Sequence, residues 1–158
     1  GQVRMVDVSD KKRSAREAIA QSTVRLSPEA FKLLTAQDNA KGEVLNTARI
    51  AGIQAAKRCA DLIPLCQTLA LDFIGIEFSL NSSEHLVHIH ATCKCSYTTG
   101  VEMEAMTAVT IAALTIYDMC KAADKGIVIE HTRLLRKSGG KSGVWEASAT
   151  SAYVKESQ

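Results

Sequence analysis

Polar and apolar residues alternate most regularly in the middle of the chain. Residues 73–80 and 86–97 both show period two, and the second stretch places on one face Val87, Ile89, Ala91, Cys93 and Cys95. This alternation is typical of half-buried strands. The polar sequence NSSE at residues 81–84 separates the two stretches. The pattern predicts a β-hairpin.

A helical period follows the hairpin. From Thr99 to about Ala123 no glycine or proline interrupts the chain after Gly100. Apolar residues recur at helical spacing, namely Met103, Met106, Val109, Ala113, Ile116, Tyr117 and Cys120. This stretch predicts the longest helix of the protein. Gly126 ends it, and residues 127–135 predict a last strand.

The first third of the chain predicts one strand and two helices. Residues 16–26 have strand composition, and Ser27 then supplies an N-cap before a proline and an acidic first turn, which favours a helix over 28–35. Residues 42–60 are rich in alanine and glycine at apolar helical spacing, typical of a closely packed helix. Pro64 disfavours its continuation.

This order of elements suits an α+β fold, an antiparallel sheet with helices packed on one face. With 158 residues, 46% of them hydrophobic, the chain supports one core. We expect a flexible polar arm over 1–15, a single catalytic domain over 16–145 and a disordered tail over 146–158.

Charge and cysteine content narrow the class of protein. Nineteen basic and 17 acidic residues give a net charge of +2, too balanced for nucleic-acid binding, and no run of about 18 apolar residues predicts a membrane span. Five cysteines, an odd number, favour a reducing compartment, and we expect the cytoplasm. The chain starts at Gly1, so an upstream targeting segment and an organellar location stay open.

Metal binding is not expected from the most suggestive cysteines. Cys93 and Cys95 share one strand face, whereas His88 and His90 share the other. Zinc sites need four converging ligands, so these thiols are better explained as buried spectators. We expect neither a metal nor a cofactor.

Ionisable residues mark both ends of the predicted long helix. Asp118 and Lys121 lie one turn apart near its end, as a pair for proton transfer or as a surface ion pair worth about 0–1 kcal/mol. Glu102 and Glu104 lie near its start, where carboxylates also favour the exposed amides. Fourteen residues separate Glu104 from Asp118, about 21 Å along a helix. One small pocket cannot hold both from one subunit.

Lysines elsewhere offer contacts for phosphate. Lys41 precedes a predicted helix start, where an exposed loop lysine is the ordinary alternative. The segment KSGGKSG contains Lys137 and Lys141, but Leu135 stands where a Walker motif needs glycine. The chain is therefore not a typical nucleoside triphosphatase. Its glycines can still close over a polyphosphate, or the segment is a solvated loop, and Arg16 is a weaker phosphate candidate.

The motifs TARIAGIQAAKR, LIPLC, TGVEMEAMTA, ALTIYDMCKA and KSGGKSG resemble the cyclic pyranopterin monophosphate synthases of molybdenum-cofactor biosynthesis. The resemblance implies a ferredoxin-like fold and a lyase. It implies conversion of cyclised dihydro-GTP (3',8-cyclo-7,8-dihydro-GTP) to cyclic pyranopterin monophosphate with release of pyrophosphate. It further implies a hexamer, a trimer of dimers with interface sites, and is compatible with transient contact with the upstream radical enzyme.

The resemblance also assigns residues. It implies a catalytic set of Lys121, Asp118, Lys41, Glu102 and Glu104. Candidate substrate contacts are Gln67, Cys66, Met103, Lys137, Lys141 and Arg16.

One position departs from the family pattern. The family motif reads LIPLCH, whereas this chain reads LIPLCQ, with Gln67 in place of an active-site histidine. An amide keeps a hydrogen bond but cannot titrate. The chain is thus an active synthase or, alternatively, a catalytically impaired variant or binding subunit of the same pathway.

Overall fold

The computed structural model describes residues 1–148 of the chain and follows the predicted order of elements. The strands are β1 (Ser14–Arg25), β2 (Phe73–Asn81), β3 (Leu86–Tyr97), β4 (Val128–Ser138) and β5 (Trp145–Glu146). The helices are α1 (Pro28–Thr35), α2 (Val44–Lys57), α3 (Cys59–Leu62) and α4 (Glu102–Cys120). Of the tail expected over 146–158, Glu146 belongs to β5, and residues 149–158 lie outside the described part.

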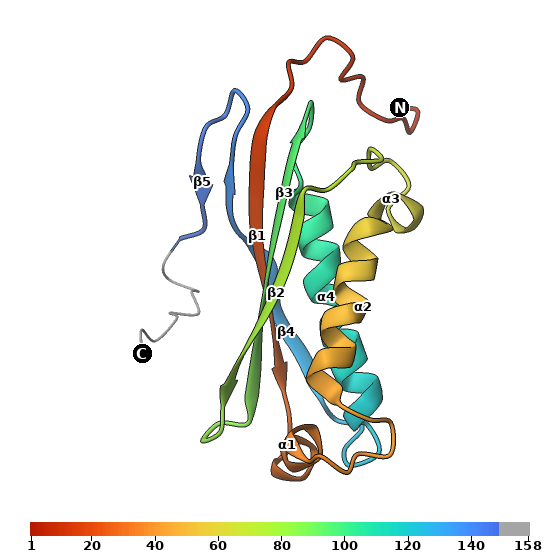
Figure 1. Ribbon diagram of the computed structural model, residues 1–158, viewed down its shortest axis with the longest axis vertical. Coiled ribbons are helices and arrows are strands. Elements are labelled where there is room, and N and C mark those ends of the chain that lie inside the picture. Colours follow the sequence, from red (N-terminus) through yellow and green to blue (C-terminus); the bar gives the residue numbers. More distant parts are fainter. Residues whose placement is uncertain (149–158) are drawn as a thin grey trace.

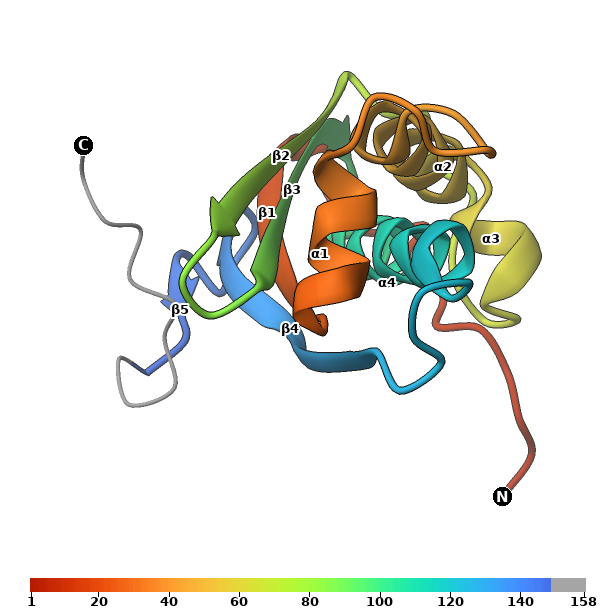
Figure 2. The same ribbon diagram turned by 90° about the horizontal axis from the view of Figure 1, so that it is seen from below.

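The strands form one antiparallel sheet in the order β2-β3-β1-β4-β5. β1 pairs with β3 from Ser14 opposite Tyr97 to Arg25 opposite Leu86, without a register shift. Helices α2 and α4 cover one face of the sheet (Figures 1 and 2). The expected α+β, ferredoxin-like arrangement is confirmed.

Strand β3 shows why the sheet has one buried face. Its predicted inward residues are between 0 and 2% exposed, as listed here: Val87, Ile89, Ala91, Cys93 and Cys95. His88 and His90 alternate with them and are only partly buried. The two imidazoles therefore point away from Cys93 and Cys95, as the sequence predicted.

Helices α2 and α4 pack closely because small residues line their contact. A Cβ on Gly52 of α2 would lie 2.9 Å from the carbonyl oxygen of Ala108 and 3.3 Å from the Cβ of Ala112 in α4. The helices run in opposite directions, so the start of α4 lies near α3 and its end lies near the start of α2 (Figure 1). This arrangement determines which residues meet at each end of α4.

Helix α4 is also the one described helix that is long and apolar enough to cross a membrane by length and composition. It packs against the sheet, and 56% of the relevant window is buried inside the protein. A core helix of a soluble protein passes the same test, so this is weak evidence for a membrane span.

Candidate active site at the two ends of helix α4

The end of α4 carries two lysines that share one carboxylate. Lys41 Nζ lies 2.9 Å from Asp118 Oδ2, and Lys121 Nζ lies 3.0 Å from Asp118 Oδ1. Hydrogen bonds from Lys41 and then from Lys121 lower the pKa of the Asp118 carboxyl. About half of each of the three side chains is exposed. The predicted pairing of Asp118 with Lys121 is present, and Lys41 joins it.

A short turn places Lys41 at this end. The Asn39 side chain accepts a hydrogen bond from the Lys41 amide at 2.9 Å and donates one to the carbonyl of Met119 at 3.2 Å. Gly42 then turns the chain with φ of 95° into α2. Lys41 Nζ also donates to the Asp118 carbonyl at 3.1 Å. Asn39 is a positioning residue that the sequence reasoning missed, because nothing local links it to α4.

This group has the chemistry of an anion site. Two ammonium groups and one carboxylate leave one net positive charge, and the carboxylate orients both cations. In the single chain the group faces solvent, which screens its charge. Covering it would strengthen its interaction with a phosphate and favour proton transfer by a lysine.

The start of α4 differs from its end, because the carboxylate of Glu104 there is buried. Glu104 is 2% exposed, and its Oε2 lies 3.6 Å from the Sγ of Cys66, which donates to it. Its Oε1 has no hydrogen-bond partner within residues 1–148. Burial raises the pKa of Glu104, and burial together with the Glu104 charge raises the pKa of Cys66 to about 12. Cys66 is therefore a neutral thiol near pH 7, and burial shifts the Glu104 equilibrium towards its neutral form.

Glu102, two residues before Glu104, has a cationic partner. Its Oε1 lies 2.9 Å from Lys137 Nζ at the end of β4, and both side chains are mostly buried. Met103 between the two glutamates is 41% exposed. The start of α4 thus offers one paired carboxylate, one buried carboxylate and an accessible thioether.

The KSGGKSG segment is partly strand and partly turn. Lys137 belongs to β4, whereas Lys141 lies exposed in the following turn. Gly139 and Gly140 have φ of 97° and 75°, and a Cβ at either position would collide with β1, at the Ala15 carbonyl or the Arg16 guanidinium. Arg16 itself donates to the carbonyl of Tyr97 at 3.0 Å. Its guanidinium is therefore anchored structurally next to Gly140.

Gln67 contacts the N-terminal arm. Its Nε2 donates to the carbonyl of Val6 at 2.8 Å. The arm passes from the top of β1 towards the side of the molecule that holds α3 (Figure 1). The Gln67 amide thus holds the arm next to the Cys66 position in the chain.

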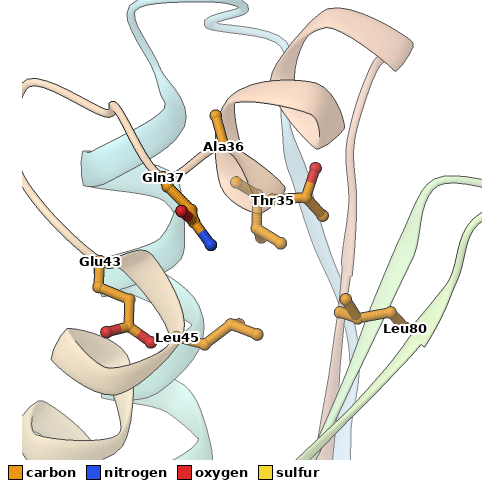
Figure 3. Close-up of a pocket in the computed structure, with 7 residues that line it drawn as sticks. Thr35, Ala36, Gln37, Glu43, Leu45 and Leu80 are labelled. Carbon is orange, nitrogen blue, oxygen red and sulfur yellow. The ribbon is translucent and has the colours of Figure 1, made fainter.

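The two ends of α4 do not form one site within a chain. Nineteen residues make α4 about 28 Å long. A cavity of about 530 Å³ opens between α1, α2 and β2 (Figure 3) and is lined by Leu34, Thr35, Ala36, Gln37, Glu43, Leu45 and Leu80. Among residues 1–148, no lysine or arginine and none of the predicted site residues lines this cavity. The two ends of α4 and the cavity are therefore three separate places in the chain.

The fold and these groups define a small α+β protein with two lysines on one carboxylate at the end of α4 and two further carboxylates at its start. The chain belongs to the MoaC family, whose family model matches residues 5–140.

Relatives support the same conclusion. The cyclic pyranopterin monophosphate synthase of Bordetella avium is 68% identical over 145 residues, which cover 92% of this chain and 90% of that protein. The enzyme of the same name from Bordetella pertussis is 63% identical over 145 residues, which again cover 92% of this chain and 90% of that protein. A solved chain of the ferredoxin protease FusC in complex with Arabidopsis ferredoxin matches at 11% identity and a TM-score of 0.31, with 66% of this chain and 10% of that one covered. That last similarity is too low to inform fold or function. The family resemblance read from the motifs is confirmed.

Proposed function

We propose that this protein is a cyclic pyranopterin monophosphate synthase, which converts cyclised dihydro-GTP to cyclic pyranopterin monophosphate and pyrophosphate in molybdenum-cofactor biosynthesis. The observation that carries the proposal is 68% identity to the Bordetella avium synthase across 92% of the chain. The reaction needs positioned acids and bases and cations for a triphosphate. Both are found at the ends of α4.

The end of α4 supplies the cations and a proton-transfer group. Lys121 acts as the general acid or base, Asp118 orients it, and Lys41 donates a proton or binds phosphate. The ion pairs at 2.9 and 3.0 Å support these roles, because a single carboxylate holds both ammonium groups close together.

The start of α4 supplies the contacts to the base-derived ring. Glu102 and Glu104 bind polar ring edges or move protons, and burial of Glu104 shifts it towards the neutral form that can donate a hydrogen bond. Candidate contacts to the substrate around them are Cys66, Gln67, Met103, Lys137, Lys141 and Arg16.

Each active site combines the start of α4 from one subunit with the end of α4 from another. The length of α4 supports this, because a small substrate cannot span about 28 Å. Apolar side chains also protrude from the helical layer, where Ile50 is 58% and Leu114 is 52% exposed. A second copy covering them would desolvate the lysines as well. The proposed assembly is a hexamer built from three dimers.

Complementation tests the shared site. Glu104→Gln and Lys121→Ala chains, each inactive alone, are co-expressed with different tags, and the mixed oligomers are purified. If sites are shared, about one quarter of them combine two intact ends, and turnover recovers to about 25% of wild type. Mixed oligomers without turnover would place both ends of each site in one subunit and overturn the shared site. A fully active monomer would do the same.

A second candidate function is a binding subunit that holds the cyclised intermediate without efficient turnover. Gln67 favours it, because its amide cannot transfer a proton and already donates to the Val6 carbonyl. Such a subunit would pass its ligand on by transient contact with the upstream radical enzyme. The substitution Gln67→His separates the two functions. For either, a reducing compartment such as the cytoplasm suits five unpaired cysteines.

A further inference from the structure

Two cysteines and one carboxylate converge beside the start of α4. Cys59 opens α3, Cys66 follows after the turn at Pro64, and Glu104 lies in the first turn of α4. The Sγ atoms of Cys59 and Cys66 are 3.8 Å apart, and Cys66 Sγ is 3.6 Å from Glu104 Oε2. One ligand atom from each residue lies within 4.8 Å of both others. No other group of three such ligands occurs among residues 1–148.

The surroundings of this cluster favour a cation. Cys59 and Glu104 are each 2% exposed, and Glu104 Oε1 has no hydrogen-bond partner in the described part of the chain. Buried polar oxygens normally have partners, so this one calls for an explanation. A metal ion on Oε2 would neutralise the charge of this buried carboxylate and use both thiols at once.

The spacing fits tetrahedral coordination. With Zn–S near 2.3 Å and Zn–O near 2.0 Å, the tetrahedral edges are about 3.8 Å between sulfurs and about 3.5 Å between sulfur and oxygen. The corresponding separations here are 3.8 and 3.6 Å. A disulfide would instead require the sulfurs to approach to about 2.05 Å. The Thr107 hydroxyl, 3.4 Å from Cys59 Sγ, is placed to donate a hydrogen bond to a metal-bound thiolate.

We propose that Cys59, Cys66 and the Glu104 carboxylate form a binding site for a thiophilic divalent cation of the zinc class. Water or an added ligand would fill the fourth position, and the partly exposed Cys66 gives access from solvent. Binding displaces to solvent the two thiol protons and, where the Glu104 carboxyl is neutral, its proton as well. This differs from the sequence-based expectation of no metal, which weighed Cys93 and Cys95 with His88 and His90 and did not combine Cys59 with Cys66.

Metal binding has a consequence that rests on the proposed function. Cys66 and Glu104 are proposed substrate contacts, whereas Cys59 is not. A bound ion occupies the Glu104 carboxylate and the Cys66 thiol, so zinc inhibits turnover. Cys59→Ala should weaken zinc binding and inhibition while leaving turnover in chelator-treated buffer unchanged.

Cobalt serves as the spectroscopic probe. The full chain is reduced, treated with chelator and titrated with Co²⁺ under anaerobic conditions, and zinc is then added in competition. Wild type should bind one Co²⁺ per chain with a thiolate-to-metal charge-transfer band and the visible bands of tetrahedral Co²⁺. Cys59→Ala and Cys66→Ser should each lose at least about tenfold in affinity, the scale of a lost zinc ligand or supporting group.

Cys120→Ala is the matched control, because Cys120 is equally buried but lies in the last turn of α4. It should retain the wild-type titration. A wild-type spectrum without the thiolate band, or affinity unaffected by Cys59→Ala, would overturn the site. So would loss of two thiols on thiol counting, which would show a disulfide instead.

The spectroscopic readout is independent of turnover. A tetrahedral Co²⁺ spectrum in a chain without synthase activity would contradict the proposed function and support the metal site. Synthase activity in a chain that binds no Co²⁺ would do the reverse.

Discussion

The two ends of α4 place carboxylates in opposite surroundings. Glu104 at the start is buried beside a thiol, and burial raises its pKa, whereas Asp118 at the end is half exposed between two lysines that lower its pKa. When the surroundings shift the pKa values of two carboxyl groups in opposite directions, as here, the groups suit separate acid and base roles. The contrast shows that partners, more than position on a helix, set what a carboxylate can do.

The helix dipole alone would explain part of this pattern. Glu102 and Glu104 lie in the first turn, and Lys121 caps the last, as a macrodipole favours. It explains neither the buried Glu104 oxygen without a partner nor the recruitment of Lys41 from 77 residues away. These two features go beyond ordinary helix stabilisation.

The largest expected effect is on kcat, and it comes from substitutions at the exposed end of α4. Lys121→Ala and Asp118→Asn should each lower kcat by about 10² to 10⁴, the range of general acid–base catalysis. The melting temperature should change little, because exposed ion pairs contribute about 0–1 kcal/mol. Steady-state kinetics and thermal unfolding measure both quantities.

Lys125→Ala, in the turn after α4, is the control for charge removal at this end. If Lys121→Ala resembled Lys125→Ala in kcat, the end of α4 would be a surface ion pair, and the contrast with Glu104 would have no catalytic meaning.

The next effect concerns Gln67 near the buried end. Gln67→His should raise the rate of the chemical step by about 10² and add a pH dependence near 6.5, because imidazole titrates there and an amide does not. Single-turnover kinetics across pH, with substrate binding measured separately, test this. Gln67→Asn controls for loss of the Val6 contact without adding a titrating group. Identical rates and pH profiles in wild type and Gln67→His would show that the amide does not limit the reaction.

A smaller effect is expected from the lysine that pairs with Glu102. Lys137→Ala should raise KM by about tenfold with kcat within a few fold, because removing a ground-state contact weakens binding of substrate and transition state alike. Lys141→Ala, which removes an exposed turn lysine, should change KM less. A larger loss in kcat than in KM for Lys137→Ala would instead place it among the catalytic groups.

The smallest effects are on how folding stability depends on pH. They should have opposite signs at the start and at the end of α4. The folded pKa of Glu104 is raised above its usual 4.5, so the native state binds more protons in that window and stability falls as pH rises through it. Glu104→Gln removes that fall and should stabilise the metal-free protein on the alkaline side.

Asp118 behaves in the reverse way. Its folded pKa lies below the usual 3.8, so its contribution is present above 3.8 and is lost as pH falls below it. Asp118→Asn should therefore destabilise slightly above pH 3.8 and be neutral in acid. Melting temperatures from about pH 3 to 8 in chelator, differing by a few degrees or less, compare the variants. Shifts of the same sign would remove the proposed difference between the ends.

Local patterns predicted most of the fold. Period two along residues 86–97 identified β3 and its buried face, and the uninterrupted helical period identified α4, because each pattern reports burial of one face. The two-residue strand β5 carries too little sequence to show a period. Half of each Asp118 and Lys121 side chain is exposed, which the apolar composition around them did not suggest.

Contacts between distant residues could not be predicted in the same way. Lys41 reaches Asp118 through a turn held by Asn39, and neither spacing nor composition connects those segments. Cys59 and Cys66 are seven residues apart, which matches no usual zinc spacing, and their carboxylate partner lies 38 residues beyond Cys66. Tertiary packing alone brings them together.

The fixed length of α4 has a consequence for insertions and deletions. Each residue of a helix adds about 1.5 Å and about 100° of rotation, so removing one residue within α4 would turn Asp118 away from Lys41 while Glu104 stayed in place. A Cβ built on Gly52 would lie only 2.9 Å from the Ala108 carbonyl oxygen, so the two helices are in close backbone contact and α2 cannot slide to follow. Length changes should therefore be tolerated in the turn at residues 82–85 but not in α4, even where the new sequence remains fully helical.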